Sequence, residues 1–190
     1  MAAPLTSRPL DVVYFAFFLI HIPATIMIDL QALYPTTVIP SVIRGLPKLY
    51  SDMSSDPLIS GVMGYLGEEA LSRLVWFKTF LAVEAVFQLP VFVLGLRGLW
   101  TGSRSIYVLL LIYAASTATT TLPCLSVLLT TPVSSSPIGV HSITPFQRLL
   151  LLSSYVPFFL IPLVMTVDMA FRVLGLVKAG EKIAKERKSH

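Results

Sequence analysis

Cysteine, histidine and charge are all scarce in this sequence, and each scarcity excludes a class of function. Cys124 is the only cysteine among 190 residues and lies in an apolar stretch, so neither an internal disulfide nor a cysteine-based metal site can form. The three histidines, His21, His141 and His190, lie far apart and lack the spacing of metal ligands. The glycines at 61, 64 and 67 do not follow a strand, so no phosphate-binding loop is predicted. We therefore expect neither a metal nor a cofactor.

The low charge and high hydrophobicity together indicate a membrane protein. Only 13% of the residues are charged, against about 25% in a soluble domain, whereas 55% are hydrophobic. A helix that crosses the hydrocarbon core of a bilayer, roughly 30 Å thick, needs about 20 apolar residues. Four stretches qualify, at about residues 10–33, 76–96, 106–129 and 149–174. We predict an all-α membrane protein, a single bundle of four transmembrane helices over residues 10–170 with no second domain.

Basic residues near the end of the chain set the predicted topology. Five of them crowd the last thirteen positions: Lys178, Lys182, Lys185, Arg187 and Lys188. Because basic segments beside membrane helices stay in the cytosol, the tail at 175–190 and, with four helices, the tail at 1–9 are both predicted to be cytosolic. The long loop between the first two helices then faces the opposite side, and its apolar residues favour short interfacial helices. The basic tail lacks the interleaved aromatic residues of a nucleic-acid surface, so no nucleic-acid partner is expected.

Two carboxylates fall well inside the apolar stretches. Asp29 lies in the first predicted helix, where His21, Thr25 and Asp29 recur at every fourth position and share one face. Glu84 lies in the second helix and shares a face with Gln88, four residues on. A charged carboxylate is expensive in hydrocarbon, so we predict that the two acids meet and share one proton.

Other polar residues have competing interpretations. The hydroxyl cluster at 116–121 either packs the helices closely, with interhelical hydrogen bonds, or lines the same cavity as the two acids. Asp56 precedes a proline, and we favour a helix cap over a ligand contact for it. Asp168 is expected to pair with Arg172, four residues on, rather than to join a buried site.

Prolines fall inside the first and last predicted helices. Pro23 removes one backbone hydrogen bond from the first helix, and Pro157 and Pro162 do the same in the fourth. We expect kinked helices at these positions. Tyr155, two residues before Pro157, offers a hydroxyl within the bundle.

Three kinds of chemistry are open to an acid pair in a membrane cavity. The anion of the pair can bind the ammonium of a cationic amphiphile among aromatic side chains. The same two groups can instead protonate an alkene and remove a proton elsewhere, which is isomerase chemistry. In the third interpretation, Asp29 and Glu84 only hydrogen-bond the helices together.

Three ordered motifs carry a resemblance to a known family over about residues 10–170. They read His21-Ile-Pro-x-Thr-x-x-x-Asp29-Leu-Gln31-Ala, then Trp76-Phe-Lys78-x-Phe-x-x-x-Glu84-x-x-Phe87-Gln88-Leu-Pro90, and Ser154-Tyr155-x-Pro157-x-x-Leu-Ile-Pro162. These motifs resemble the sigma-2 receptor branch of the EXPERA family, which also includes the emopamil-binding sterol isomerase. The resemblance implies a four-helix protein of the endoplasmic reticulum membrane with a lipid-accessible cavity for sterols and cationic amphiphilic ligands.

The resemblance also implies roles for particular residues. Asp29 resembles the acid that meets the ligand ammonium, and Glu84 resembles its proton-sharing partner. Five further positions correspond to other site or mouth residues: Gln88, Tyr155, His21, Thr120 and Asp56.

The resemblance implies a binding protein in sterol homeostasis or trafficking rather than an enzyme, with the sterol isomerase as the catalytic alternative. Fungal relatives of this branch resemble a factor in the quality control of unimported mitochondrial precursors, which is a third class of function. The expected partners are a sterol or cationic amphiphile and membrane lipids, and a membrane-protein partner and a homodimer stay open. The ending Arg187-Lys188-Ser189-His190 is similar to a cytosolic retrieval signal for the endoplasmic reticulum.

Overall fold

The structure is a computed structural model, and it describes residues 3–35, 37–134 and 141–188. Within these residues, four helical segments are long and apolar enough to span a membrane: Pro9–Ala32, Val75–Thr101, Arg104–Thr130 and Pro145–Lys188. Each one matches, to within a few residues or with extensions, a stretch that the sequence predicted to cross the bilayer. The prediction of a four-helix membrane bundle is therefore confirmed.

The spanning segments are built from five α-helices and shorter turns. The first segment joins α1 (Pro9–Met27) to a 3-10 turn (Asp29–Ala32), and the second joins α6 (Val75–Val83), a π-helical turn (Glu84–Gln88) and α7 (Leu89–Thr101). The third is mostly α8 (Tyr107–Thr130), preceded by a 3-10 turn (Arg104–Ile106), and the fourth is α9 (Pro145–Lys188). A further 3-10 turn, Leu5–Ser7, precedes α1.

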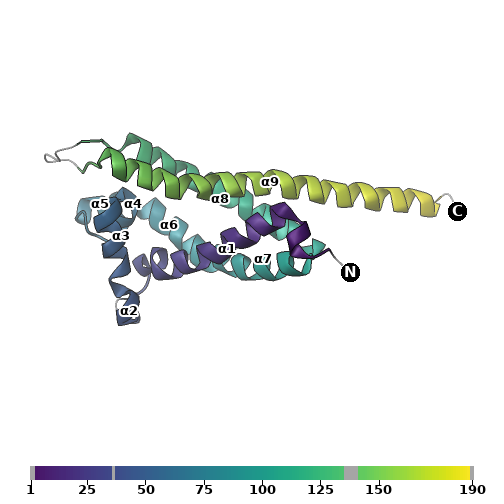
Figure 1. Cartoon of the computed structure of the whole chain (residues 1–190), viewed down its shortest axis with the longest axis horizontal. Helices are drawn as coiled ribbons and strands as arrows, with labels where there is room; N and C mark the ends of the chain where they lie inside the picture. Colours follow the sequence, from purple (N-terminus) through teal and green to yellow (C-terminus); the bar gives the residue numbers. More distant parts are fainter. Residues whose placement is uncertain (1–2, 36, 135–140, 189–190) are drawn as a thin grey trace.

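Figure 1 shows how these elements are arranged. Helices α8 and α9 run side by side along one layer, and α1 and α7 pack together below them. Both ends of the chain lie toward the same end of the bundle, and the short helices α2 to α5 lie at the other end (Figure 1). An even number of spans accounts for this placement.

The last helix is longer than its membrane-crossing part. The sequence predicts a spanning helix over 149–174 followed by a basic tail, whereas α9 begins at Pro145 and continues to Lys188. The residues from 174 to 188 are all exposed, and Lys, Glu and Ala in this part are good helix formers. Figure 1 shows this end of α9 projecting beyond the rest of the bundle.

The loop between the first two spans contains the short helices that its apolar residues predict. They are α2 (Ser41–Arg44), α3 (Leu46–Ser54), α4 (Pro57–Val62) and α5 (Glu68–Arg73). Asp56 is the N-cap of α4, because its Oδ1 accepts hydrogen bonds from the backbone N–H groups of Leu58 (2.8 Å) and Ile59 (3.1 Å). The helix-capping interpretation of Asp56 is confirmed.

The hydrophobic core divides into two main clusters. One, at the end where the chain termini lie, joins α1, α7, α8 and α9 through aromatic side chains such as Phe18, Phe92 and Tyr113. The other joins α4, α6 and α8 around Leu58 and Phe77. In the first cluster Gly95 lets α7 approach α1, since a Cβ there would lie 2.7 Å from Cε2 of Phe18.

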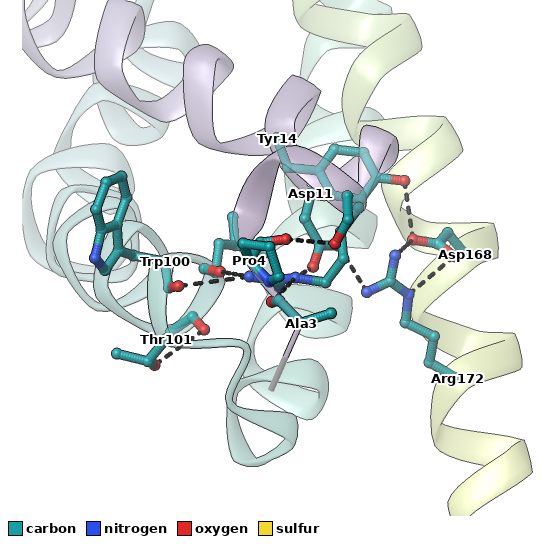
Figure 2. Close-up of polar contacts among 12 residues, drawn as sticks. Ala3, Pro4, Asp11, Tyr14, Trp100, Thr101, Asp168 and Arg172 are labelled. Atoms are coloured by element: carbon teal, nitrogen blue, oxygen red, sulfur yellow. Dashed lines mark hydrogen bonds and ion pairs between the residues drawn. The ribbon is translucent and has the colours of Figure 1, made fainter. Parts of the chain in front are cut away.

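An ionic cluster that the sequence analysis did not anticipate lies at the terminal end of the bundle. Asp11 is only 1% exposed and pairs with both Arg8 and Arg172, whose Nη1 donates to Asp11 Oδ1 at 2.7 Å. Arg172 also pairs with Asp168 at 2.8 Å, as predicted, and the Tyr14 hydroxyl donates to Asp168. Figure 2 shows Asp11 and Tyr14 of α1 converging with Asp168 and Arg172 of α9.

The same cluster reaches the other two spans. Arg8 Nη2 donates to the carbonyl oxygen of Leu99 at 2.7 Å, near the end of α7. The guanidinium of Arg172 lies over the ring of Tyr107 in α8, 5.3 Å from its centroid. All four spans therefore meet at one set of charges.

Replacing Asp11 should destabilise the protein strongly. The substitution Asp11→Asn leaves two guanidinium groups close together without the buried carboxylate between them, and breaking such a pair costs roughly 3–5 kcal/mol. The free energy of unfolding, measured in mixed micelles titrated with a denaturing detergent, should fall by an amount of this order. The control is Asp52→Asn, which breaks an exposed pair with Lys48 and should have little effect. Equal effects of the two variants would contradict the structural role of Asp11.

A side chain at Gly95 should also separate the first two spans. In Gly95→Val the new atoms meet Phe18, which is fully buried and held by neighbouring rings, and overpacking of this kind costs about 1–3 kcal/mol. The thermal unfolding midpoint in detergent should fall. Gly175→Val is the matched control, because a Cβ at Gly175 meets nothing within 4 Å. If both variants unfold at the wild-type temperature, the close contact is not essential.

Candidate functional site

A cavity of about 270 Å³ lies within the helix bundle. Apolar and aromatic side chains form most of its wall, among them Ile28, Phe77, Phe80, Leu81 and Phe158. Six of the seven residues that the sequence predicted for the site line it: His21, Asp29, Glu84, Gln88, Thr120 and Tyr155. The seventh, Asp56, is not in the lining and lies directly behind it.

Glu84 is held by hydrogen-bonding groups of the first span. The hydroxyl of Thr25 donates to Glu84 Oε1 at 2.5 Å, and Nε2 of His21 lies 3.5 Å from the same oxygen. Glu84 is 9% exposed and occupies the first position of the π-helical turn. The first and second spans are thus joined at the cavity wall.

The π-helical turn has a local cause in the sequence. Pro90 has no backbone N–H, so the usual bond to the carbonyl four residues earlier cannot form. At the residue before Pro90, the backbone N–H of Leu89 donates to the carbonyl of Glu84, five residues earlier rather than four. The turn widens the helix where Glu84 and Gln88 point into the cavity.

His21 is fixed by three aromatic rings. Its imidazole stacks on Phe92 at 4.6 Å between centroids and meets the edges of Phe158 at 4.5 Å and Phe17 at 5.2 Å. Within the described residues its Nδ1 is buried without a hydrogen-bond partner. These contacts leave Nε2 as the nitrogen that faces Glu84.

Asp29 differs from the other acids of the bundle. It lines the cavity and is half-buried, and the described part of the chain provides its carboxylate with no hydrogen bond or ion pair. The charged groups that act on it are two further acids, Glu84 and Asp56. The α-helix ends at Met27, and Ile28 turns the backbone before the 3-10 turn that carries Asp29. The first span predicted at about residues 10–33 thus consists of an α-helix and a 3-10 turn, and Asp29 reaches the cavity from the turn.

Asp56 lies behind two tyrosines that form part of the cavity wall. Its Oδ2 accepts hydrogen bonds from the hydroxyls of Tyr155 (2.8 Å) and Tyr50 (3.0 Å), both of which line the cavity. Burial raises the pKa of the Asp56 carboxyl above its usual range, and the donors around it oppose that effect. Asp56 thereby connects the cap formed by α3 and α4 to α9.

The hydroxyl cluster of α8 takes part in the lining. Thr120 and Thr121 face the cavity, whereas Thr119 is exposed. All three hydroxyls donate to carbonyl oxygens of their own helix, such as Thr121 Oγ1 to Thr117 at 2.8 Å. Each of these three hydroxyls thus returns to its own backbone rather than to another helix, and Thr117, Thr120 and Thr121 line the cavity, as the second interpretation of the cluster expects.

Some lining residues gave no sequence signal of function. Tyr50 lies in the loop between the spans, and its position against Asp56 depends on how α3 and α4 fold together. Cys124 and Phe158 also face the cavity, and in the sequence they look like ordinary core residues. Across the described ranges, no group of three His, Cys, Asp or Glu side chains is placed to hold a metal ion.

Comparisons with known proteins agree with this architecture. The chain is 36% identical over 172 residues to human "Sigma intracellular receptor 2", covering 89% of this chain and 92% of that protein. It is 30% identical over 166 residues to the Xenopus tropicalis protein of the same name, covering 87% and 90%. It is also 27% identical over 157 residues to "Efficient mitochondria targeting-associated protein 19" of Saccharomyces cerevisiae, covering 79% and 91%.

The match to a family model spans most of the bundle. Residues 42–169 match the model of EXPERA (EXPanded EBP superfamily). The matched part includes most of the loop that carries Asp56 and the spans that carry Glu84, Thr120 and Tyr155. With the similarity to the sigma receptors over about nine-tenths of its length, this four-helix membrane protein belongs to the EXPERA family.

Proposed function

We propose that the cavity binds sterol-like and cationic amphiphilic molecules, with Asp29 as the anion that meets the ligand ammonium. The observation that carries this proposal concerns Asp29, which faces a mostly apolar cavity. Its carboxylate receives no hydrogen bond and no ion pair from the described residues, and the charged groups that act on it are acids. A carboxylate in low-dielectric surroundings needs a compensating charge. A bound ammonium supplies it.

The wall of the cavity suits the rest of such a ligand. Its lining is mostly apolar, and Phe77, Phe80 and Phe158 present aromatic rings, which favour cations through their negative faces. A volume of about 270 Å³ lies near the lower end of small-molecule sites, roughly 300–1,000 Å³. Glu84 provides the second acid of the pair, and Gln88, Thr120, Tyr155 and His21 provide polar contacts around it.

Binding is favoured over catalysis as the role of this site. The relatives with the higher identities are named as receptors. That name fits a cavity in which one acid, Asp29, has no hydrogen-bond or ion-pair partner among the described residues. The isomerase alternative would use the acid pair, Asp29 and Glu84, to give and to remove a proton, with Nε2 of His21 3.5 Å from Glu84. Formation of a rearranged sterol by the purified protein would favour that alternative.

The cellular setting extends the proposal. We place the protein in the endoplasmic reticulum membrane with both termini in the cytosol, where it acts in sterol homeostasis or trafficking. The basic residues at the end of α9 support this orientation. Homodimers and a membrane-protein partner are compatible with the apolar outer surface of the bundle.

A second candidate function is in the handling of mitochondrial proteins. The match to a yeast protein named for efficient mitochondria targeting favours it. This role predicts that loss of the protein causes precursors to accumulate, and that a variant without the cavity acid restores import. A ligand-dependent role predicts that the same variant fails to complement.

The first test is equilibrium binding of a tertiary amine with an apolar ring system to the purified protein. Asp29→Asn keeps the shape of the side chain and removes its charge, so affinity should fall by at least about 30-fold, in line with the loss of one partner of a buried charge pair. Asp52→Asn, an exposed acid on α3, is the control and should bind as wild type does. Failure of folded wild-type protein to bind the amine would sink the proposal.

A further inference from the structure

The last part of α9 lies outside the bundle. Arg172 still belongs to the bundle, because its Nη1 pairs with Asp11 of α1 at 2.7 Å. Every residue from 174 to 188 is exposed, and Figure 1 shows this part of α9 projecting beyond the other spans. A helix of about 15 residues without tertiary packing is only marginally stable in water. A surface outside the protein would therefore stabilise the segment 174–188.

This segment has an apolar side and a basic side. Its apolar residues recur every three or four positions and so share one side of the helix: Leu176, Val177, Gly180, Ile183 and Ala184. Val177 is 52% exposed and Ile183 is 54% exposed. Three lysines at helical spacing, Lys178, Lys182 and Lys185, occupy the opposite side. Helices of this kind lie in the interface of a membrane, with the apolar side toward the acyl chains and the basic side toward the headgroups.

The charge of the segment favours anionic lipids over a neutral surface. Five basic and two acidic residues give positions 174–188 a net charge of +3. One of the acids, Glu186, lies 4.0 Å from Lys182, and an exposed pair of this kind holds the lysine only weakly. Arg187 lies on the apolar side in the last turn, where its long stem follows the interface while the guanidinium reaches a lipid phosphate. Each basic residue near an anionic leaflet strengthens association by about fivefold.

A straight helix keeps most of these charges away from the bilayer. The apolar stretch of the fourth span ends at about residue 174, so the surface of the bilayer lies near Arg172. At about 1.5 Å per residue, Lys185 lies roughly 20 Å beyond Arg172 along the helix axis. Salt screens charges over about 8 Å under physiological conditions. The basic residues of the last turns therefore meet the headgroups only if the segment turns toward them.

Gly175 is the position at which such a turn is easiest. It follows Arg172 by three residues, and a Cβ there would meet nothing within 4 Å, so no close packing requires a glycine. Glycine has a lower helix propensity than every residue except proline, and it adopts conformations outside the helical region readily. Gly180 has the same open surroundings and weakens the straight helix further.

We propose that α9 turns at Gly175 and that residues 176–188 lie on the anionic lipid headgroups of the membrane that the bundle spans. Val177 and Ile183 then enter the interface, and the lysines contact the phosphate and carboxylate groups of the lipids. The inference goes beyond the function proposed for the cavity and does not depend on it. It agrees with the cytosolic orientation proposed for the tail, since anionic lipids are concentrated in the cytosolic leaflet.

The test is hydrogen exchange of the full chain in lipid nanodiscs, followed by mass spectrometry. One set of discs contains phosphatidylcholine alone, and the other contains phosphatidylcholine mixed with phosphatidylserine in both leaflets, so the result does not depend on orientation. The amides of residues 176–188 should exchange at least about tenfold more slowly in the anionic discs, because docking stabilises the helix. High salt should remove the difference. The exposed helix α5, at the other end of the bundle, is the internal control and should exchange at the same rate in both discs.

Variants of exposed residues separate the roles of the two sides of the helix. Lys178→Gln, Lys182→Gln and Lys185→Gln, combined in one variant, keep a good helix former at each position and should abolish the slowing. Glu181→Gln, beside the lysines on the helix, removes a negative charge and should slow exchange further. Ile183→Ser removes an apolar contact and should reduce the slowing. All of these positions lie outside the bundle, so the thermal unfolding midpoint should stay at the wild-type value.

Three results would overturn the inference. Equally fast exchange in both discs means that the segment does not dock on lipid, and its basic side is then left for an acidic protein. Equally slow exchange in both discs means that charge has no part in the docking. If Gly175→Ala leaves the difference between the discs unchanged, α9 does not turn at Gly175. The triple lysine variant should bind the tertiary amine as wild type does, so failure of this inference is distinguishable from failure of the proposed function.

Discussion

The requirement that a buried carboxylate be compensated governs this structure from end to end. In a low-dielectric interior an acid must find a cation, hydrogen-bond donors or a proton. At the terminal end of the bundle, Asp11 is compensated by Arg8 and Arg172, and these three charges draw the spans together. Around the cavity the compensation comes from neutral hydroxyls instead, as at Glu84. The same requirement thus builds a fixed ionic cluster in one place and, in another, an acid pair on the wall of a mostly apolar cavity.

Departures from regular helix produce the shape of the cavity. The first span breaks after Met27, and the second contains a π-helical turn before Pro90. Both irregularities occur where the side chains of the acid pair enter the cavity. Backbone of this kind is tolerated at membrane depth when neighbouring helices and side chains satisfy it. With a regular α-helix in both places, Asp29 and Glu84 would point in other directions. The two local breaks therefore help to bring the acid pair to the cavity.

The sequence predicts the large features of the fold better than the fine ones. Hydropathy alone gives four spans, because the length of an apolar stretch is a local property. Rare acids in such stretches lead directly to Asp29 and Glu84, and the structure brings both to one cavity. The burial of Asp11 could not be predicted in this way, because it depends on pairing with Arg172, 161 positions away. The π-helical turn is not predicted either: the expected kinks lie only in the first and last helices, and a proline does not by itself specify a π-helical turn.

The kind of donor at each acid separates structural from functional roles around the cavity. Asp56 accepts hydrogen bonds from two backbone N–H groups and two tyrosine hydroxyls, and it holds the cap in place. Glu84 has one hydroxyl donor, and Asp29 has none among the described residues. Hydroxyl donors stabilise a carboxylate without cancelling its charge, whereas a guanidinium would cancel it. With no basic side chain in the described lining, the negative charge of the acid pair stays available, and a cation from outside is the partner that completes the site.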